Sequence, residues 1–214
     1  MFTGQIEQRL ASLRIIPVVT IDDPRSALPL GKALIDGGLP VCEITFRTEA
    51  AFESIKMISA ELPEILIGAG TVLTAEQADN AITAGAAFIV SPGFNPHVVD
   101  YCLERGYCVF PGVNSPTQVE MGLERGLRTL KFFPAEISGG IAMLKALAAP
   151  YGDVRFLPTG GIDAANVARY LALRTVIACG GSWMVKPPLI AEGQFDQIRR
   201  LTHEAVAAAS GLPA

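Results

Sequence analysis

A single lysine stands inside the apolar run Thr129-Leu130-Lys131-Phe132-Phe133-Pro134, which has the composition of a buried β-strand. Lysine is almost never buried unless another group satisfies its charge. Burial disfavours the ammonium form, and a neutral amine in an apolar pocket is a nucleophile that forms Schiff bases with carbonyl carbons. The alternative is an edge strand whose lysine points to solvent. The architecture around this run therefore decides the role of Lys131.

Similar apolar runs recur along the 214-residue chain, and each is followed by a segment with helical periodicity. The runs begin roughly every 20 to 26 residues, which is the length of one strand–loop–helix–loop unit. Strands are expected over residues 15–21, 41–46, 65–69, 88–91, 108–111, 129–133, 155–158 and 176–179. Helices are expected over residues 26–36, 50–61, 75–84, 97–105, 117–125, 140–148, 164–171 and 195–208.

Eight such units predict an α/β fold with one domain, a closed parallel (β/α)8 TIM barrel that spans residues 1–214. An N-terminal helix is expected before the first strand, because Ile6, Leu10 and Leu13 fall on one helical face. An open doubly wound sheet is the alternative, although no GxGxxG motif follows the first strand. Left-handed glycines are expected to end four helices, at Gly37, Gly85, Gly106 and Gly126.

The formal net charge is −4 and no basic cluster is present, which argues against nucleic acid as a partner. Half of the residues are hydrophobic, yet no uninterrupted apolar run is long enough to cross a bilayer. The first residues lack the basic start and the apolar stretch of a secretory signal. We therefore expect a soluble cytoplasmic protein with a large core and no membrane partner.

The cysteines and histidines are too dispersed to predict a disulfide framework or a metal centre. The four cysteines have no CxxC spacing, so we expect reduced thiols: Cys42, Cys102, Cys108 and Cys179. His97 and His203 lie far apart in the sequence, and His203 has charged neighbours in a helical pattern. We expect no metal ligand among them, and a surface position for His203.

Polar side chains stand where two of the expected strands end. In a barrel, alternate side chains face the lumen, and the chemistry lies at the carboxyl ends of the strands. Glu43, Thr45 and Arg47 then face inward together, as does Lys131, because Leu130 suits the helix layer. A purely structural Glu43–Arg47 ion pair is the alternative.

The ends of three other strands are rich in glycine and hydroxyl groups. Thr71 follows the third strand as a lumen hydroxyl, unless it caps the next helix, for which Thr74 is better placed. Glycine pairs follow the last two strands, in Thr159-Gly160-Gly161 and in Gly180-Gly181-Ser182. Loops after the seventh and eighth strands of barrels commonly hold phosphate. The pattern predicts Schiff-base chemistry on a 2-oxo acid that also carries a phosphate.

With these residues in place, the sequence resembles the class I 2-keto-3-deoxy-6-phosphogluconate (KDPG) aldolases, which also cleave 4-hydroxy-2-oxoglutarate. The resemblance runs from about residue 15 to residue 183 and is carried by several motifs in the family's order. These motifs are GLPVCEITFRT at 38–48, GAGTVL at 68–73, SPG at 91–93, PGV at 111–113, LKFFPAE at 130–136, PTGGI at 158–162 and GGSW at 180–183.

The resemblance implies a role for each matching position. Lys131 corresponds to the Schiff-base lysine and Glu43 to the general acid and base. Arg47 and Thr71 correspond to the groups that hold the pyruvate carboxylate, and Phe133 to a ring beside it. The rest of the sugar acid and its phosphate correspond to Thr159, Gly160, Gly161, Gly181 and Ser182. The resemblance further implies a homotrimer and a covalent intermediate on Lys131 without a metal or cofactor.

Three alternatives remain open from the sequence. The sister aldolase for the galactonate epimer (KDPGal) shares the lysine, the acid and the arginine, although Thr159 with Ser182 favours the gluconate substrate. A phosphosugar isomerase would explain the phosphate loops but would leave Lys131 without a role. A non-catalytic phosphate-binding barrel would keep an inward lysine and glutamate buried at a cost in stability.

Overall fold

The computed structural model describes residues 3–210, in which strands and helices alternate along the chain. Residues 1–2 and 211–214 of the predicted domain lie outside the described part. The strands are β1 Ile15–Val19, β2 Val41–Thr45, β3 Leu66–Gly70, β4 Phe88–Val90, β5 Val109–Phe110, β6 Gly112–Val113, β7 Thr129–Phe132, β8 Arg155–Pro158 and β9 Cys179–Gly181. The helices are α1 Thr3–Leu13, α2 Ala27–Asp36, α3 Ala51–Glu61, α4 Ala75–Thr83, α5 Pro96–Glu104, α6 Pro116–Glu124, α7 Gly140–Ala148, α8 Val167–Leu171, α9 Pro187–Ala191 and α10 Phe195–Ser210, with a short 3₁₀ helix η1 at Pro24–Ser26.

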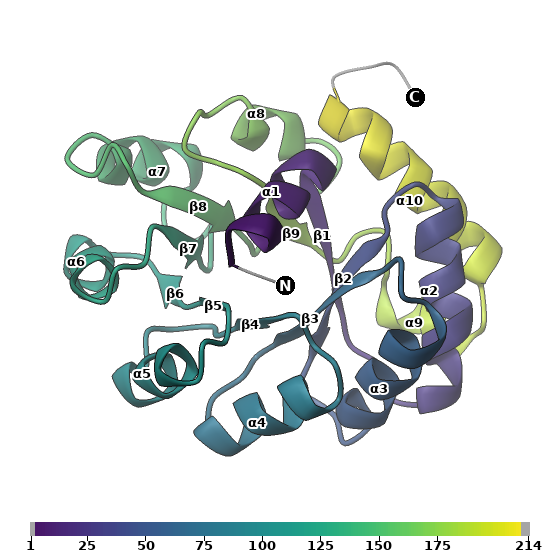
Figure 1. Ribbon diagram of the computed structural model, residues 1–214. Coiled ribbons are helices and arrows are strands. Elements are labelled where there is room, and N and C mark those ends of the chain that lie inside the picture. Colours follow the sequence, from purple (N-terminus) through teal and green to yellow (C-terminus); the bar gives the residue numbers. More distant parts are fainter. Residues whose placement is uncertain (1–2, 211–214) are drawn as a thin grey trace.

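The strands form a curled, all-parallel arrangement with the helices α2 to α8 and α10 outside it (Figure 1). Six strands make one sheet in the order β5-β4-β3-β2-β1-β9, and three make a second sheet in the order β6-β7-β8. The two sheets follow each other at Pro111, which has no N–H to donate and separates β5 from β6. Isolated bridges join Phe156 to Val176 and Thr159 to Gly180, between β8 and the segment around β9. The predicted single eight-stranded barrel is therefore met only in part.

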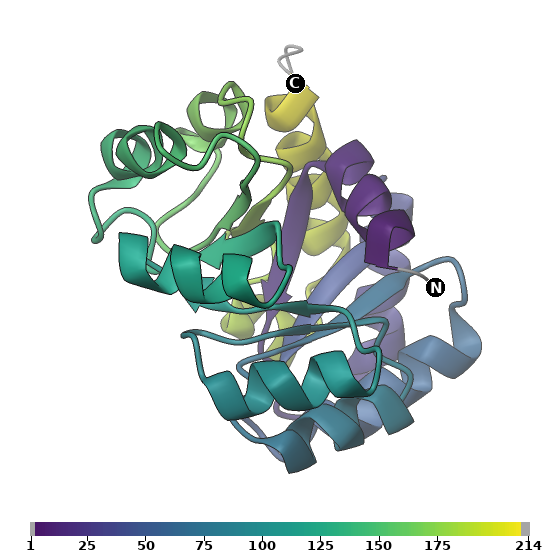
Figure 2. The same cartoon turned by 60° about the vertical axis from the view of Figure 1, so that its left-hand side comes forward.

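Helix α1 packs across the amino-terminal ends of the strands: Figure 1 shows it inside the ring of outer helices, in front of the region of β1 and β9, and Figure 2 shows it beside β1. Ile6 and Leu10 are fully buried on its inner face, as the spacing predicts. Arg9 donates to the carbonyl of Glu64, just before β3. The Thr3 hydroxyl bonds to Cys108, just before β5. The amphipathic N-terminal segment thus closes one end of the strand arrangement.

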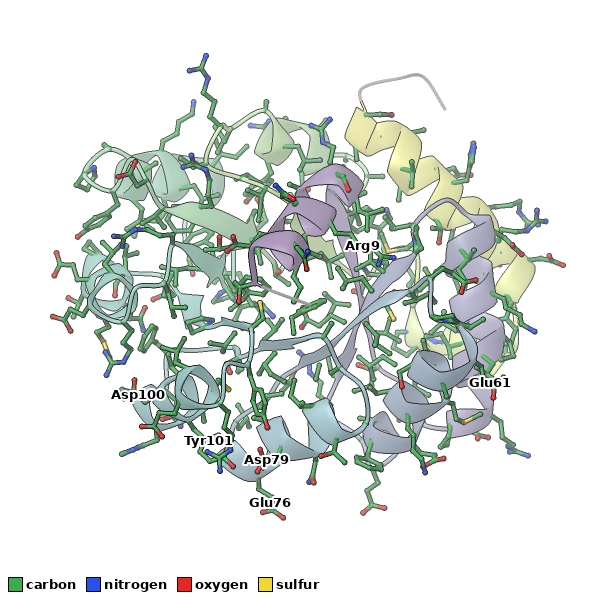
Figure 3. The ribbon with its side chains drawn as sticks, viewed as in Figure 1. Arg9, Glu61, Glu76, Asp79, Asp100 and Tyr101 are labelled. Atoms are coloured by element: carbon green, nitrogen blue, oxygen red, sulfur yellow. The ribbon has the colours of Figure 1, made fainter. Side chains whose placement is uncertain are left out.

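The outer helices are also tied to one another. Tyr101 on α5 donates to the carboxylate of Asp79 on α4, and these two labelled side chains meet at the rim of the molecule (Figure 3). Tyr107 donates to the other oxygen of Asp79, at 3.2 Å. Among residues 3–210, no helix is both long and apolar enough to cross a membrane.

Several local predictions were wrong in detail, and the helix expected over 164–171 begins only at Val167. A strand over 176–179 was expected, but the last strand begins at Cys179 and ends at Gly181. The Val176 amide donates to the Leu173 carbonyl in a turn, and pairing with β1 starts only at Cys179. Gly37 is right-handed with φ −79°, and the left-handed residue after α2 is Gly38 at φ +84°. The other three expected helix-ending glycines are left-handed: Gly85, Gly106 and Gly126.

Candidate active site

The predicted alternation along β7 is confirmed and sends Lys131 inward. Leu130 and Phe132 are fully buried, and Leu130 faces α6, where it packs against the backbone of Gly122. Lys131 lies between them, in register with Gly112 of β6 and Leu157 of β8. Its residue exposure is 5%, so the edge-strand alternative does not describe this lysine.

Glu43 of β2 meets Lys131 inside the curled strands. The distance between Lys131 Nζ and Glu43 Oε1 is 3.3 Å, and both side chains are almost completely buried. The neighbouring strand leaves space for the carboxylate, since a Cβ atom on Gly70 would lie 2.1 Å from Glu43 Oε1. An acid and an amine in contact can exchange a proton, and their opposite charges offset part of the cost of burying either group. Glu43 contacts this lysine, which argues against the structural pairing with Arg47 considered above.

Arg47 and Thr71 stand at the carboxyl ends of β2 and β3. Arg47 Nε donates to Thr71 Oγ1 at 3.3 Å, and the Arg47 side chain is otherwise exposed. Thr71 has φ +56°, a left-handed conformation that is costly for a β-branched residue and that clusters at functional sites. Thr74 caps α4 by accepting from the amide of Gln77, so Thr71 is free of that structural role.

A cavity of about 210 Å³ opens at the carboxyl ends of the strands. It brings together seven of the ten predicted site residues: Arg47, Phe133, Thr159, Gly160, Gly161, Gly181 and Ser182. Phe133 connects it to the buried pair, because the Phe133 ring centre lies 5.3 Å from Lys131 Nζ. Strands β1, β2, β7, β8 and β9 thus converge on one hollow.

The loop after β8 is shaped to present amides to an anion. Gly160 and Gly161 are left-handed, with φ +102° and +79°. The Gly160 carbonyl accepts from the Glu136 amide, and the Gly161 carbonyl accepts from Asn166 Nδ2 at 2.9 Å. In a trans peptide the following N–H points opposite to the carbonyl, so the Gly161 and Ile162 amides point away from Glu136 and Asn166 respectively. Successive backbone amides in such turns form concave anion sites.

Four further cavity residues were missed by the sequence reasoning: Val18, Thr20, Ile162 and Pro187. Val18 and Thr20 belong to the run expected as a strand over 15–21, to which no site residue was assigned. The period-two alternation of that strand is the signal that places both side chains on the inward face. Pro187 begins α9, a helix that was not predicted.

The cysteines and histidines lie outside this chemistry. All four cysteines are free and buried, as expected from their spacing. Burial, with a smaller effect of the Glu43 charge, raises the pKa of the Cys42 thiol to about 12. Cys42 is therefore a protonated packing residue behind Glu43. His97 and His203 are exposed, as expected for His203.

Comparison with known proteins agrees with this geometry. The sequence model of the aldolase family "KDPG and KHG aldolase" matches residues 6–201. The chain belongs to this family. The 2-dehydro-3-deoxy-phosphogluconate aldolase of Treponema pallidum is 52% identical to this chain over 93% of the chain and 95% of its own length. These relationships make the chain an aldolase, a lyase that cleaves carbon–carbon bonds.

Solved structures that share the fold of this chain include two KDPG aldolases. The Legionella pneumophila KDPG aldolase, with pyruvate captured as a covalent carbinolamine, superposes with a TM-score of 0.91 at 38% identity and covers 94% of this chain and 98% of its own. The Zymomonas mobilis KDPG aldolase with 3-phosphoglycerate gives a TM-score of 0.87 at 39% identity, with 96% and 95% covered.

Proposed function

We propose that this protein is a class I aldolase that cleaves 2-keto-3-deoxy-6-phosphogluconate to pyruvate and glyceraldehyde 3-phosphate through a Schiff base on Lys131. We propose that it also cleaves 4-hydroxy-2-oxoglutarate to pyruvate and glyoxylate. The observation that carries the proposal is the buried contact of 3.3 Å between Lys131 Nζ and Glu43 Oε1, beside a cavity rich in polar groups. The covalent pyruvate carbinolamine of the Legionella relative supports the same chemistry here.

The reaction begins when the Lys131 amine, after giving its proton to Glu43, attacks C2 of the substrate. Glu43 then supplies the proton needed for water to leave, and the resulting iminium is an electron sink. Glu43 next removes the proton of the C4 hydroxyl, and the C3–C4 electron pair moves into the iminium as the aldehyde forms. Protonation of the enamine at C3 and hydrolysis of the iminium release pyruvate and regenerate Lys131.

Both ends of the substrate carry negative charge, so both need positively charged or hydrogen-bond-donating groups around them. Arg47, positioned against Thr71, offers a guanidinium to the carboxylate at C1, a pairing that suits its planar fork. The amides of the Gly160–Gly161 loop, with Gly181 and the Ser182 hydroxyl, offer hydrogen bonds to the phosphate on C6. Phe133 packs beside the pyruvate part, and Thr159 lies between the two ends.

The iminium takes the place of a Lewis acid, so the proposed mechanism calls on no metal and no organic cofactor. Catalysis should therefore survive exhaustive treatment with a chelator. Loss of turnover on chelation, restored by a divalent cation, would contradict this part of the proposal.

The direct test is incubation with pyruvate and borohydride, followed by intact mass and peptide mapping. We expect a reduced adduct on Lys131 in the wild-type chain and none in Lys131→Met. A folded wild-type protein without the adduct would exclude Schiff-base chemistry and favour a phosphosugar isomerase or a binding barrel.

The substrate's configuration needs a separate assay, since the galactonate epimer would use the same lysine and acid. We propose the gluconate form, because Thr159 and Ser182 both line the cavity and offer hydroxyl groups there. A higher kcat/KM on the galactonate epimer than on the gluconate would reverse this assignment.

We propose a cytoplasmic homotrimer in which each chain completes a closed (β/α)8 barrel. Large exposed apolar side chains, Ile137 at 90% and Leu73 at 50%, support burial between subunits. The bridges between Phe156 and Val176 and between Thr159 and Gly180 support closure. Light scattering on the purified protein should give three times the mass of the chain.

A further inference from the structure

Thr20 is a cavity residue to which neither the sequence pattern nor the proposed mechanism gives a role. It follows the carboxyl end of β1 and lines the cavity with Arg47, Thr159 and Ser182. Its side chain is partly exposed, unlike that of its partner Thr45, which is 1% exposed.

The direction of the hydrogen bonds around Thr20 follows from the number of available protons. The Thr45 hydroxyl donates to the Val19 carbonyl at 2.9 Å. Thr45 Oγ1 also lies 3.1 Å from Thr20 Oγ1. A hydroxyl has one proton and two lone pairs, so Thr45 can only accept in its contact with Thr20. The Thr20 hydroxyl therefore donates to Thr45, and its lone pairs are left for the cavity.

The level of Thr20 in the cavity indicates which part of a substrate it meets. Val18 is in register with Glu43. Thr20 and Thr45 follow these residues by two positions, so they lie about 7 Å nearer the cavity mouth than the Glu43 position. Lys131 is in register with Leu157, which places Thr159 at the corresponding level on the other wall. The Gly160–Gly161 loop begins immediately beyond Thr159. Thr20 is thus between the level of the Lys131–Glu43 pair and the phosphate loop.

We propose that Thr20 is a specificity residue that accepts a hydrogen bond from the substrate hydroxyl between the cleaved bond and the phosphate, the C5 hydroxyl of the sugar acid. This proposal rests on the proposed function, which places C2 on Lys131, the C4 hydroxyl at Glu43 and the phosphate at the glycine loop. The fixed polarity of the Thr20–Thr45–Val19 chain makes the site an acceptor and so selects a hydroxyl at C5.

The test compares Thr20→Val, which has nearly the same shape, with Thr20→Ser, which keeps the hydroxyl. Thr20→Val should raise KM for the six-carbon phosphorylated substrate roughly 3- to 10-fold, the effect of one neutral hydrogen bond, while kcat changes little. Thr20→Ser should stay within about twofold of wild type. 4-Hydroxy-2-oxoglutarate has a carboxylate where the larger substrate has its C5 carbinol, so its KM should be the same in wild type and Thr20→Val.

A 5-deoxy analogue of the phosphorylated substrate completes the cycle. With the wild-type enzyme, the KM of the analogue should exceed that of the natural substrate by the same factor that Thr20→Val raises the KM of the natural substrate. With Thr20→Val, the analogue and the natural substrate should have the same KM. Equal losses on both natural substrates, or an unchanged KM for the phosphorylated substrate, would overturn the role of Thr20. The pyruvate–borohydride adduct separates the two proposals: its absence from the wild type rejects the aldolase chemistry, and this role with it. Its presence in both proteins with unaltered kinetics rejects only Thr20.

Discussion

The Nζ atom of Lys131 lies 3.3 Å from Oε1 of Glu43, although 88 positions separate the two residues in the chain. The contact joins β7 to β2 across the inside of the curled strands, so the two sheets share a buried ion pair as well as backbone bridges. Removing one member of a buried pair leaves the other unpaired, whereas removing both is often nearly neutral.

Lys131→Met should therefore reduce the free energy of unfolding by about 3 kcal/mol, because Glu43 is left buried without its partner. The double variant Lys131→Met/Glu43→Gln should recover most of this loss. Urea unfolding followed by circular dichroism measures both. Lys56→Met is the surface control, since Lys56 is exposed and forms an ion pair with the exposed Glu53, so its loss should change stability by less than about 0.5 kcal/mol. A single variant as stable as wild type would show that the pair does not couple.

Glu43→Gln should lower kcat by roughly 10²- to 10⁴-fold, because the amide cannot take and return the protons that the mechanism moves. The cleavage rate is measured by coupling pyruvate release to lactate dehydrogenase. Glu53→Gln, on the exposed side of α3, should retain the wild-type rate. A kcat within threefold of wild type for Glu43→Gln would assign proton transfer to another group.

Gly70→Ala should impair catalysis although glycine 70 has no reactive group. The new methyl would lie 2.1 Å from Glu43 Oε1, the oxygen that contacts Lys131 Nζ, so the carboxylate must shift from its position. We expect kcat to fall at least 10-fold, since displacement of a catalytic group by about 1 Å is costly. Gly152→Ala is the matched control, because a Cβ atom there meets nothing within 4 Å. Equal activity in the two variants would contradict the assigned position of Glu43.

Asn166→Ala should weaken the binding of phosphorylated substrates selectively. Asn166 holds the loop at both ends, donating to the Gly161 carbonyl at 2.9 Å and accepting from the Asp163 amide at 3.0 Å. KM for the phosphorylated sugar acid should rise roughly 5- to 10-fold, as expected when one or two hydrogen bonds are lost. KM for 4-hydroxy-2-oxoglutarate, which has no phosphate, should stay within twofold. A parallel rise for both substrates would indicate a general loss of structure.

Stability should fall as the pH rises above about 10, the ordinary tyrosine pKa. Each tyrosine donates to a carboxylate, and its pKa is raised: Tyr101 by its hydrogen bond to Asp79, Tyr107 chiefly by burial, Tyr151 by its hydrogen bond to Glu120, and Tyr170 by burial and then by Glu136. The unfolded chain then binds fewer protons than the native chain, so the slope of unfolding free energy against pH is negative. Absorbance at 295 nm should show native tyrosines ionising at higher pH than the urea-unfolded ones. Tyr170→Phe should flatten the slope.

Period-two alternation was the most informative feature of the sequence. It placed Lys131 and Glu43 on the inward face because Leu130 and Cys42 are apolar neighbours that belong among the helices. Alternation needs no knowledge of distant contacts, since it follows from the strand itself. The contact between the two residues could be expected only from the closed architecture that the repeated units imply.

The failed predictions involve choices that local pattern cannot decide. Strand β6 lies beyond the strand expected over 108–111 and was missed, because two residues after a proline carry no readable periodicity. The run at 176–179 is apolar along its length, yet hydrogen bonding to β1 starts only at Cys179. Thr20 lies in an apolar run, and threonine occurs both in buried strands and on cavity walls, so the pattern did not indicate a site role for it.

Helix α1 covers the end of the strands opposite the cavity, with Ile6 and Leu10 buried beneath it, so we expect substrate to enter at the carboxyl ends of the strands. Substrate enters and both fragments depart by the same route. In the proposed mechanism, the aldehyde fragment lies nearer the cavity mouth and leaves first, while the pyruvate fragment is still bonded to Lys131. Free aldehyde that returns to the cavity would then add to the enamine and re-form the six-carbon acid. A high aldehyde concentration is therefore expected to slow net cleavage before pyruvate is released.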